Sequence, residues 1–303
     1  MHKFLDPKTI SRVKDLPLVA KTLAQGFLHG IHASTQRGVG VEFSQYRVYE
    51  PGDDLAKIDW KLFARSDKYF VREAERESDV NNWFILDTSR SMLQRSQPDN
   101  TNDEQWHKLA YAQVLIATVS YLAQKQGDNV GFLALSSKEQ TYLPAISGQR
   151  HWQKILLGLT KLTATDTFPE FTQIANQLGA MQKNGVIYII SDFHQQDSEV
   201  VELVGKLSNA RTEIVAIQLT CNDEENFAYK GALRFEDLET KEQILVSAQQ
   251  VKAQYLAEKA MYQAQLIAQL TKYQVQHFVA NIDEPLDQTL FDILTVRNKA
   301  AIK

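Results

Sequence analysis

The sequence predicts an α/β protein with a doubly wound, mostly parallel sheet that helices cover on both faces. Apolar runs without alternation, which are typical of strands buried on both faces, recur along the chain, as at residues 83–86 and 185–190. A segment of helical periodicity or a loop insertion follows each expected strand of the main sheet. This order produces parallel strands joined by crossover helices.

The N-terminal part of the chain differs in composition from the rest. Residues 8–33 predict a helix because apolar side chains recur there at steps of three and four. Glycines and a Pro51-Gly52 pair follow, mixed with acids, arginines and aromatics, so the next segment predicts turns. We therefore expect residues 1–79 to form an N-terminal extension packed on a main domain of residues 80–303.

The main domain is expected to alternate strands and helices. Its helices are predicted from apolar stripes such as Leu109, Leu115 and Leu122, and its strands from short apolar runs. The expected order is a strand at 83–86, a helix at 109–122, a strand at 129–135 with a short partner at 140–143, helices at 151–163 and 170–182, strands at 185–190 and 211–219, a two-stranded excursion at 233–246, a helix at 247–272, a strand at 274–280 and a closing helix at 286–297.

Composition limits the function classes. The chain has 303 residues, 44% hydrophobic and 23% charged, with a net charge of -4, so no global attraction to nucleic acid is expected. Cys221 is the only cysteine, which excludes an internal disulfide or a cysteine metal cluster. The N-terminus lacks the apolar core of a signal peptide, and no run approaches the roughly 18 apolar residues of a spanning helix. These features predict a cytoplasmic protein without membrane insertion.

Polar side chains follow two of the expected strands. Asp87, Ser89 and Ser91 come directly after the first buried strand, and Ser191-Asp192 ends another. Ligands of open parallel sheets bind at the carboxyl ends of strands, and carboxylate and hydroxyl oxygens suit magnesium. The first motif is short, and it is also compatible with a turn in which Asp87 or Ser89 caps the next helix. The polar pair Ser191-Asp192 at the end of a second strand favours a metal site over a simple turn.

A longer pattern resembles a known family. The matching blocks are Gly40-x-Glu42-Phe43, Arg47-x-Tyr49-x-Pro51-Gly52-Asp53-Asp54, Ile58-Asp59-Trp60, Ala64-Arg65, Val71-Arg72-Glu73 and Asp87-x-Ser89-x-Ser91-Met92. Together they look like the bacterial family called domain of unknown function 58, which is von Willebrand factor A-like and whose genes commonly lie beside those of MoxR-type AAA+ ATPases. The chain departs from the family at Leu55-Ala56-Lys57, where basic residues are usual.

The resemblance implies a metal ion-dependent adhesion site. Its ligands to Mg²⁺ or Mn²⁺ would be Asp87, Ser89, Ser91, Thr167 and Asp192. In the resembled domains a second loop supplies a threonine, and Thr165 is the alternative to Thr167. An exchangeable position on the metal would then take an acidic group of a protein partner or client. The implied function is a non-enzymatic interaction module, an adaptor of a MoxR-type ATPase.

Other functions remain open from the sequence. A haloacid dehalogenase-like phosphotransferase needs a second acid where this chain has Ser89, and His194 beside Asp192 would allow metal-assisted hydrolysis. A purely structural α/β domain is the third possibility. Finally, a charge-paired network is expected to hold the N-terminal segment against the main domain, formed by Arg47, Tyr49, Asp53, Asp54, Asp59, Trp60 and Arg65.

Overall fold

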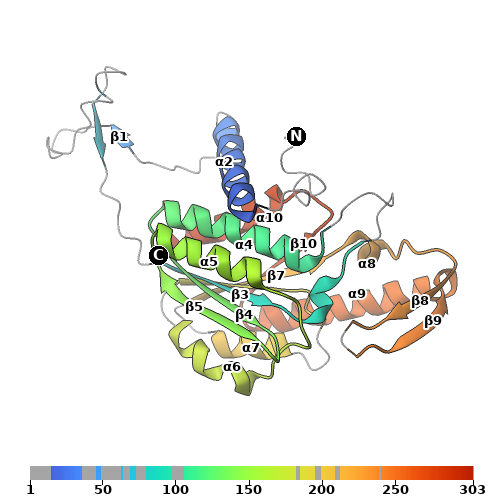
Figure 1. The fold of residues 1–303 in the computed structure, drawn as a ribbon. Coiled ribbons are helices and arrows are strands. Elements are labelled where there is room, and N and C mark those ends of the chain that lie inside the picture. The colour runs from blue at the N-terminus through green and yellow to red at the C-terminus, as the bar shows by residue number, and fades with distance from the viewer. Residues whose placement is uncertain are drawn as a thin grey trace.

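The core of the fold is a six-stranded sheet with the order β10-β7-β6-β3-β4-β5 (Figure 1). The computed structural model describes residues 15–35, 46–48, 63, 69–72, 80–96, 106–181, 185–194, 199–208, 212–238 and 240–302. The strands are β3 (Asn81–Asp87), β4 (Asn129–Leu135), β5 (Gln140–Ile146), β6 (Gly185–Ser191), β7 (Thr212–Thr220) and β10 (Gln276–Asn281). All neighbours pair in parallel except β4 and β5, which form an antiparallel edge.

Helices cover both faces of this sheet. One face carries α2 (Leu16–Thr35), α4 (Lys108–Lys125), α5 (Gln149–Lys161) and α10 (Asp287–Ile302), and the other carries α6 (Phe171–Leu178), α7 (Glu199–Leu207) and α9 (Ala248–Lys272). Successive residues of a strand point to opposite faces, so β3 sends Phe84 and Leu86 to the first layer and Trp83 and Ile85 to the second. The predicted fold class is confirmed.

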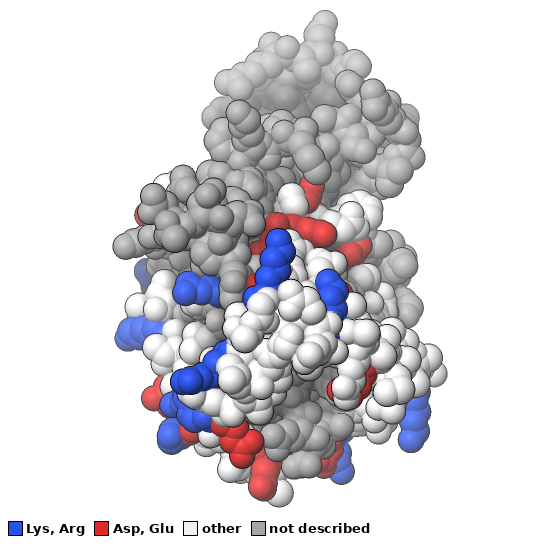
Figure 2. All heavy atoms as spheres, turned by 90° about the vertical axis from the view of Figure 1, so that its right-hand side faces the viewer, with Lys and Arg blue, Asp and Glu red and all other residues white. Residues whose placement is uncertain are grey.

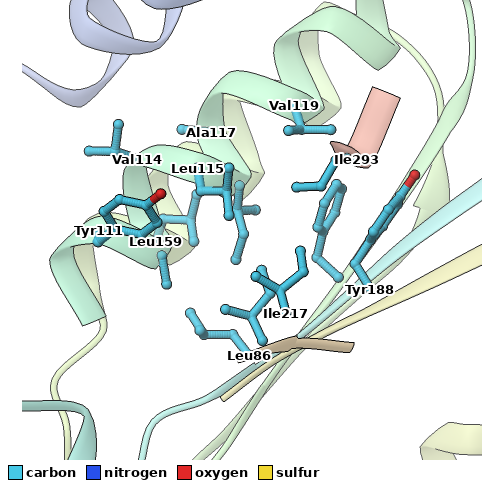
Figure 3. Close-up of a cluster of buried hydrophobic side chains, with 14 of the residues drawn as sticks. Leu86, Tyr111, Val114, Leu115, Ala117, Val119, Leu159, Tyr188, Ile217 and Ile293 are labelled. Atoms are coloured by element: carbon cyan, nitrogen blue, oxygen red, sulfur yellow. The ribbon is translucent and has the colours of Figure 1, made fainter. Parts of the chain in front are cut away.

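The apolar runs are strands buried on both faces, as expected. From Asn82 onward every residue of β3 is buried, and Phe84 stacks on Tyr188 of β6 with ring centroids 5.0 Å apart. Figure 3 shows how Leu115 and Val119 of α4 lie over this layer. Such close packing holds the strands in register and so fixes the positions of their carboxyl ends.

One glycine is required by the pairing of β3 with β4. Trp83 lies opposite Gly131, and a Cβ at that position would collide with the indole ring. The indole therefore packs over the glycine backbone, which a larger residue would prevent.

The predicted elements are present with shifted ends. The partner strand expected at 140–143 extends to Ile146, and the helix expected at 170–182 ends at Leu178 and continues as the 3-10 turn η4 (Gly179–Met181). The two-stranded excursion is β8 (Ala232–Glu236) paired with β9 (Gln243–Ser247). Between β7 and β8 lies the short helix α8 (Asn222–Asn226).

The N-terminal segment is described in part. Val19, Leu23 and Phe27 of α2 are buried in the same hydrophobic cluster as α4. The strands β1 (Tyr46–Val48) and β2 (Phe70–Arg72) pair antiparallel. The polar network predicted for this segment lies outside the residues whose side chains the structure describes, and the boundary at residues 79 and 80 stays a prediction.

Candidate metal centre

Two aspartates meet at the carboxyl ends of adjacent parallel strands. The strand β3 ends at Asp87, and β6 ends at Ser191, which Asp192 follows. The parallel register places Leu86 opposite Ile190, so the next residues, Asp87 and Ser191, are also neighbours. The Ser191 hydroxyl donates to Asp87 Oδ2 at 2.7 Å. Both aspartates are 1% exposed.

The loop after β3 gathers three of the predicted ligands. The Ser89 amide donates to Asp87 Oδ1 at 2.8 Å, and the hydroxyls of Ser89 and Ser91 are 3.0 Å apart. Ser89 precedes the 3-10 turn η3 (Arg90–Leu93), but its side chain makes no capping hydrogen bond. Helix capping therefore does not account for the Ser89 hydroxyl, whereas Asp87 does form an Asx-type turn with the Ser89 amide.

A buried lysine faces the second aspartate. Lys108 lies in the first turn of α4 with its side chain fully buried, and its Nζ is 3.3 Å from Asp192 Oδ2 and 2.7 Å from Glu224 Oε1. The other oxygen of Asp192 accepts from the His194 amide at 3.2 Å. Sequence reasoning missed Lys108 and Glu224. A lysine in the first turn, where the helix dipole disfavours a cation, was the available signal for Lys108.

The two aspartates differ in electrostatic environment. Burial, and then the negative charge of Asp192, raise the pKa of Asp87 to about 7. Burial is also the largest single effect on Asp192, but the Lys108 ammonium, His194 and hydrogen bonds from the His194 amide and the Ser91 side chain together outweigh it and lower the pKa of Asp192. Burial alone would lower the pKa of Lys108, and the charges of Asp192 and Glu224 raise it instead. Asp192 therefore lies beside a cation, whereas burial and the charge of Asp192 disfavour the anion of Asp87.

The backbone after Asp192 has an uncommon conformation. Phe193 is buried and adopts a left-handed φ of 59°, which costs a bulky residue about 1–3 kcal/mol. Its amide donates to the Ser191 hydroxyl at 2.9 Å, and its carbonyl accepts from the Tyr262 hydroxyl of α9. These bonds fix the direction in which Asp192 leaves the strand.

The second loop lies beside the first through its backbone. The Thr165 amide donates to the Thr88 carbonyl, and the Arg90 amide donates to the Asp166 carbonyl, both at 2.9 Å. The half-buried Thr165 shares a 3.0 Å hydrogen bond with Ser136 through its hydroxyl. The exposed Thr167 instead directs its hydroxyl to Ser137 at 3.4 Å. These contacts favour Thr165 as the second-loop ligand, and Thr167 stays the sequence prediction.

The donor set fits a small divalent cation. Carboxylate and hydroxyl oxygens are hard ligands of the kind that Mg²⁺ and Mn²⁺ prefer. Burial and the neighbouring Asp192 charge both disfavour the Asp87 anion, and a bound cation would oppose both effects. Within the described residues no three His, Cys, Asp or Glu side chains gather as a metal site, so such an ion would depend on the hydroxyls as well.

The comparisons identify the family. The profile described as Protein of unknown function DUF58 matches residues 45–265. The chain belongs to the DUF58 family. One similar protein is Uncharacterized protein Rv1480 of Mycobacterium tuberculosis, which is 27% identical over 71% of this chain and 66% of its own length. Uncharacterized protein YeaD of Bacillus subtilis is 27% identical over 48% of this chain and 31% of its own. The chain thus spans slightly less than two thirds of Rv1480.

Similar solved structures are distant. The VWA domain of SpRpn10 is 12% identical, covers 71% of this chain and 94% of its own, and has a TM-score of 0.35. An aerotolerance-related membrane protein of Bacteroides fragilis is 15% identical, covers 73% and 99% of the two chains, and has a TM-score of 0.45. An uncharacterized membrane spanning protein of Vibrio fischeri is 12% identical, covers 71% and 96%, and has a TM-score of 0.26.

These descriptions correct the predicted location. Two of the similar structures are described as membrane proteins, which contradicts the cytoplasmic location predicted for this DUF58 chain, so that prediction is wrong. Its grounds were the single cysteine, the lack of the apolar core of a signal peptide at the N-terminus and the lack of a long apolar run. In the described part of the chain no helix combines the length and apolarity needed to cross a membrane.

Proposed function

We propose that this chain is a non-enzymatic protein-interaction module that binds Mg²⁺ or Mn²⁺ at the edge formed by β3 and β6. The supporting observation is that two buried aspartates, Asp87 and Asp192, meet at the strand ends with the Ser89 and Ser91 hydroxyls in the same loop. A divalent cation would stabilise both carboxylates as anions. Aspartate and hydroxyl oxygens hold it, and water completes the coordination.

The composition of the ligand shell suggests what the metal binds. Asp87 and Asp192 bring only two formal negative charges, and one of them is already paired with Lys108. Neutral hydroxyls and waters fill the remaining positions, so one water can be exchanged for a carboxylate. We propose that an acidic side chain of a protein partner or client takes this position.

The surface supports recognition by a local site. On the described part of the face in Figure 2, basic and acidic side chains are interspersed with uncharged areas. Such a face provides no broad field of one sign to attract a partner from a distance. Specificity then depends on the metal and the side chains immediately around it.

A MoxR-type AAA+ ATPase is the proposed partner. The support is membership in the DUF58 family together with the resemblance of residues 38–92, which implies neighbouring ATPase genes. The sequence contains no Walker phosphate loop, so an ATP-driven process would need a separate ATPase. The metal-bound site of the module would then bind either a client or the ATPase itself.

Association in solution tests this proposal. The purified chain should retain the ATPase of its own organism in a pull-down with magnesium and ATP. EDTA or Asp87→Asn should weaken retention of either the ATPase or a client. Asp128→Asn is the matched control, because Asp128 is also buried but precedes β4 at the amino ends of the strands, where it accepts from Asn82 Nδ2 at 3.2 Å. If neither EDTA nor Asp87→Asn changes the retention of the ATPase or of a client, the proposed role of the metal is contradicted.

An enzyme assay separates the main alternative. The proposal predicts no substantial magnesium-dependent hydrolysis of phosphoesters by the purified chain. If such hydrolysis occurred and Asp87→Asn abolished it while Asp128→Asn did not, a hydrolase or phosphotransferase would replace the interaction module.

A further inference from the structure

Lys108 is a buried cation placed behind the candidate metal centre. Its ammonium contacts Asp192 from the core side, at the start of α4, and none of its side chain is exposed. The Asp87 carboxylate accepts hydrogen bonds from Ser89 and Ser191, and the Lys108 ammonium pairs with Asp192 and Glu224. Lys108 therefore acts on one of the two aspartates.

Glu224 keeps this lysine in place. Its second oxygen accepts from the Cys221 amide at 3.2 Å. Its carbonyl accepts from Lys259 Nζ of α9 at 2.9 Å. With both its carboxylate and its backbone held, Glu224 remains a counterion for Lys108 when the Asp192 charge is shared with a metal.

The charges of this group determine what a bound metal attracts. Lys108 adds one positive charge to a group that also holds the carboxylates of Asp87, Asp192 and Glu224. Removing the ammonium would make this group more negative by one charge, beneath the exchangeable position. A buried charge of that sign would repel an incoming carboxylate, because the interior screens charges weakly.

We propose, on the basis of the metal site proposed above, that Lys108 sets the charge of that site: it weakens metal binding by competing for Asp192, and it strengthens the binding of an acidic group to the metal. The role of Lys108 is thus to position and neutralise Asp192, without coordinating the metal. It makes the site dependent on its acidic partner.

Metal affinity tests the first half of this proposal. Mn²⁺ is titrated into the full, metal-free chain, and free Mn²⁺ is followed by electron paramagnetic resonance. Lys108→Met should bind Mn²⁺ at least about tenfold more tightly than the wild type, because a positive charge near the ion has been removed. Lys108→Arg should return the affinity to within about threefold of the wild type, because the charge is restored.

Two further variants control for general charge effects and for folding. Lys241→Met removes a cation that pairs with Glu236 at 3.0 Å, away from Glu224 and Asp192, so its Mn²⁺ affinity should stay within about twofold. Glu224→Gln removes one of the two carboxylates that the structure shows beside Lys108 and should weaken Mn²⁺ binding. Circular dichroism verifies the fold, and if Lys108→Met does not fold, the comparison of Glu224→Gln with Lys241→Met decides the outcome.

Acetate tests the second half, as a minimal carboxylate. Acetate binding to the Mg²⁺-saturated chain, measured by calorimetry, should be at least about fivefold weaker for Lys108→Met than for Lys108→Arg. If the wild type binds Mn²⁺ and Lys108→Met binds it equally or more weakly, the role inferred for Lys108 is overturned, but the proposed metal site is retained. If Lys108→Met binds Mn²⁺ and the wild type does not, the role inferred for Lys108 is supported, but the metal has no part in the wild-type function. If no folded variant binds Mn²⁺, both the role of Lys108 and the metal site are overturned.

Discussion

Asp87 and Asp192 occupy almost equivalent places, at the ends of neighbouring parallel strands and equally buried, yet their pKa values shift in opposite directions. Burial acts on both in the same sense. The neighbouring charges differ, since the Lys108 ammonium, with His194 and hydrogen bonds, lowers the pKa of Asp192, whereas the negative charge of Asp192 raises the pKa of Asp87. The comparison shows that a strand end provides the position of a carboxylate, whereas a distant residue decides whether it is a stable anion.

Removal of each charge in turn should give the largest difference between the two aspartates. In EDTA at pH 8, Asp192→Asn should lower the free energy of unfolding by about 3 kcal/mol, because it breaks a buried ion pair. Asp87→Asn should leave it unchanged or raise it, because it removes a charge that repels Asp192. Urea denaturation measures both. An equal loss in the two variants would show that the aspartates are electrostatically alike.

The pH dependence of the metal-free chain should show the same asymmetry. Because the folded state raises the Asp87 pKa from 3.8 to about 7, the folded state binds the extra proton between these values. Stability should therefore fall by about 2–4 kcal/mol as pH rises from 4 to 7, and then level off. The lowered pKa of Asp192 acts in another window, where stability is lost as pH falls below about 3.8.

Asp87→Asn provides the check on this pH profile. Urea denaturation at a series of pH values in EDTA should give a flatter curve for Asp87→Asn than for Asp128→Asn. A wild-type profile that rises from pH 4 to 7 would show that the environment of Asp87 favours its anion even without a metal.

Added metal should stabilise the folded state through the Asp87 carboxylate. At about one hundred times its dissociation constant, Mg²⁺ should stabilise the wild type by about 2.7 kcal/mol, because it binds only the folded state. Asp87→Asn and Asp192→Asn should lose most of this gain, while Asp128→Asn should keep it. Thermal unfolding with and without Mg²⁺ measures the effect, and an equal gain in all four proteins would place the ion elsewhere.

The sequence predicted the parts of this site that depend on local order. Asp87 and Asp192 could be placed together because each follows an apolar strand, and parallel strands end at a common edge. Lys108 could not be paired with Asp192, because the two are 84 positions apart and only the packing of α4 brings them together. A lysine among apolar residues is also compatible with an exposed position, and only tertiary structure excludes it here.

The second-loop threonine is the point at which sequence and structure differ most finely. Sequence favours Thr167, whereas the Asp166 residue between the candidates has a left-handed φ of 52° that turns the chain, and Thr165 is the one bonded to the Asp87 loop. We expect Thr165→Val, which removes the hydroxyl at nearly constant volume, to weaken Mn²⁺ binding by about tenfold, and Thr165→Ser to preserve it. Thr167→Val should change the affinity by less than about twofold, because its exposed hydroxyl is directed to Ser137. The reverse order of effects would restore Thr167 as the ligand, and would require the loop to turn when the ion binds.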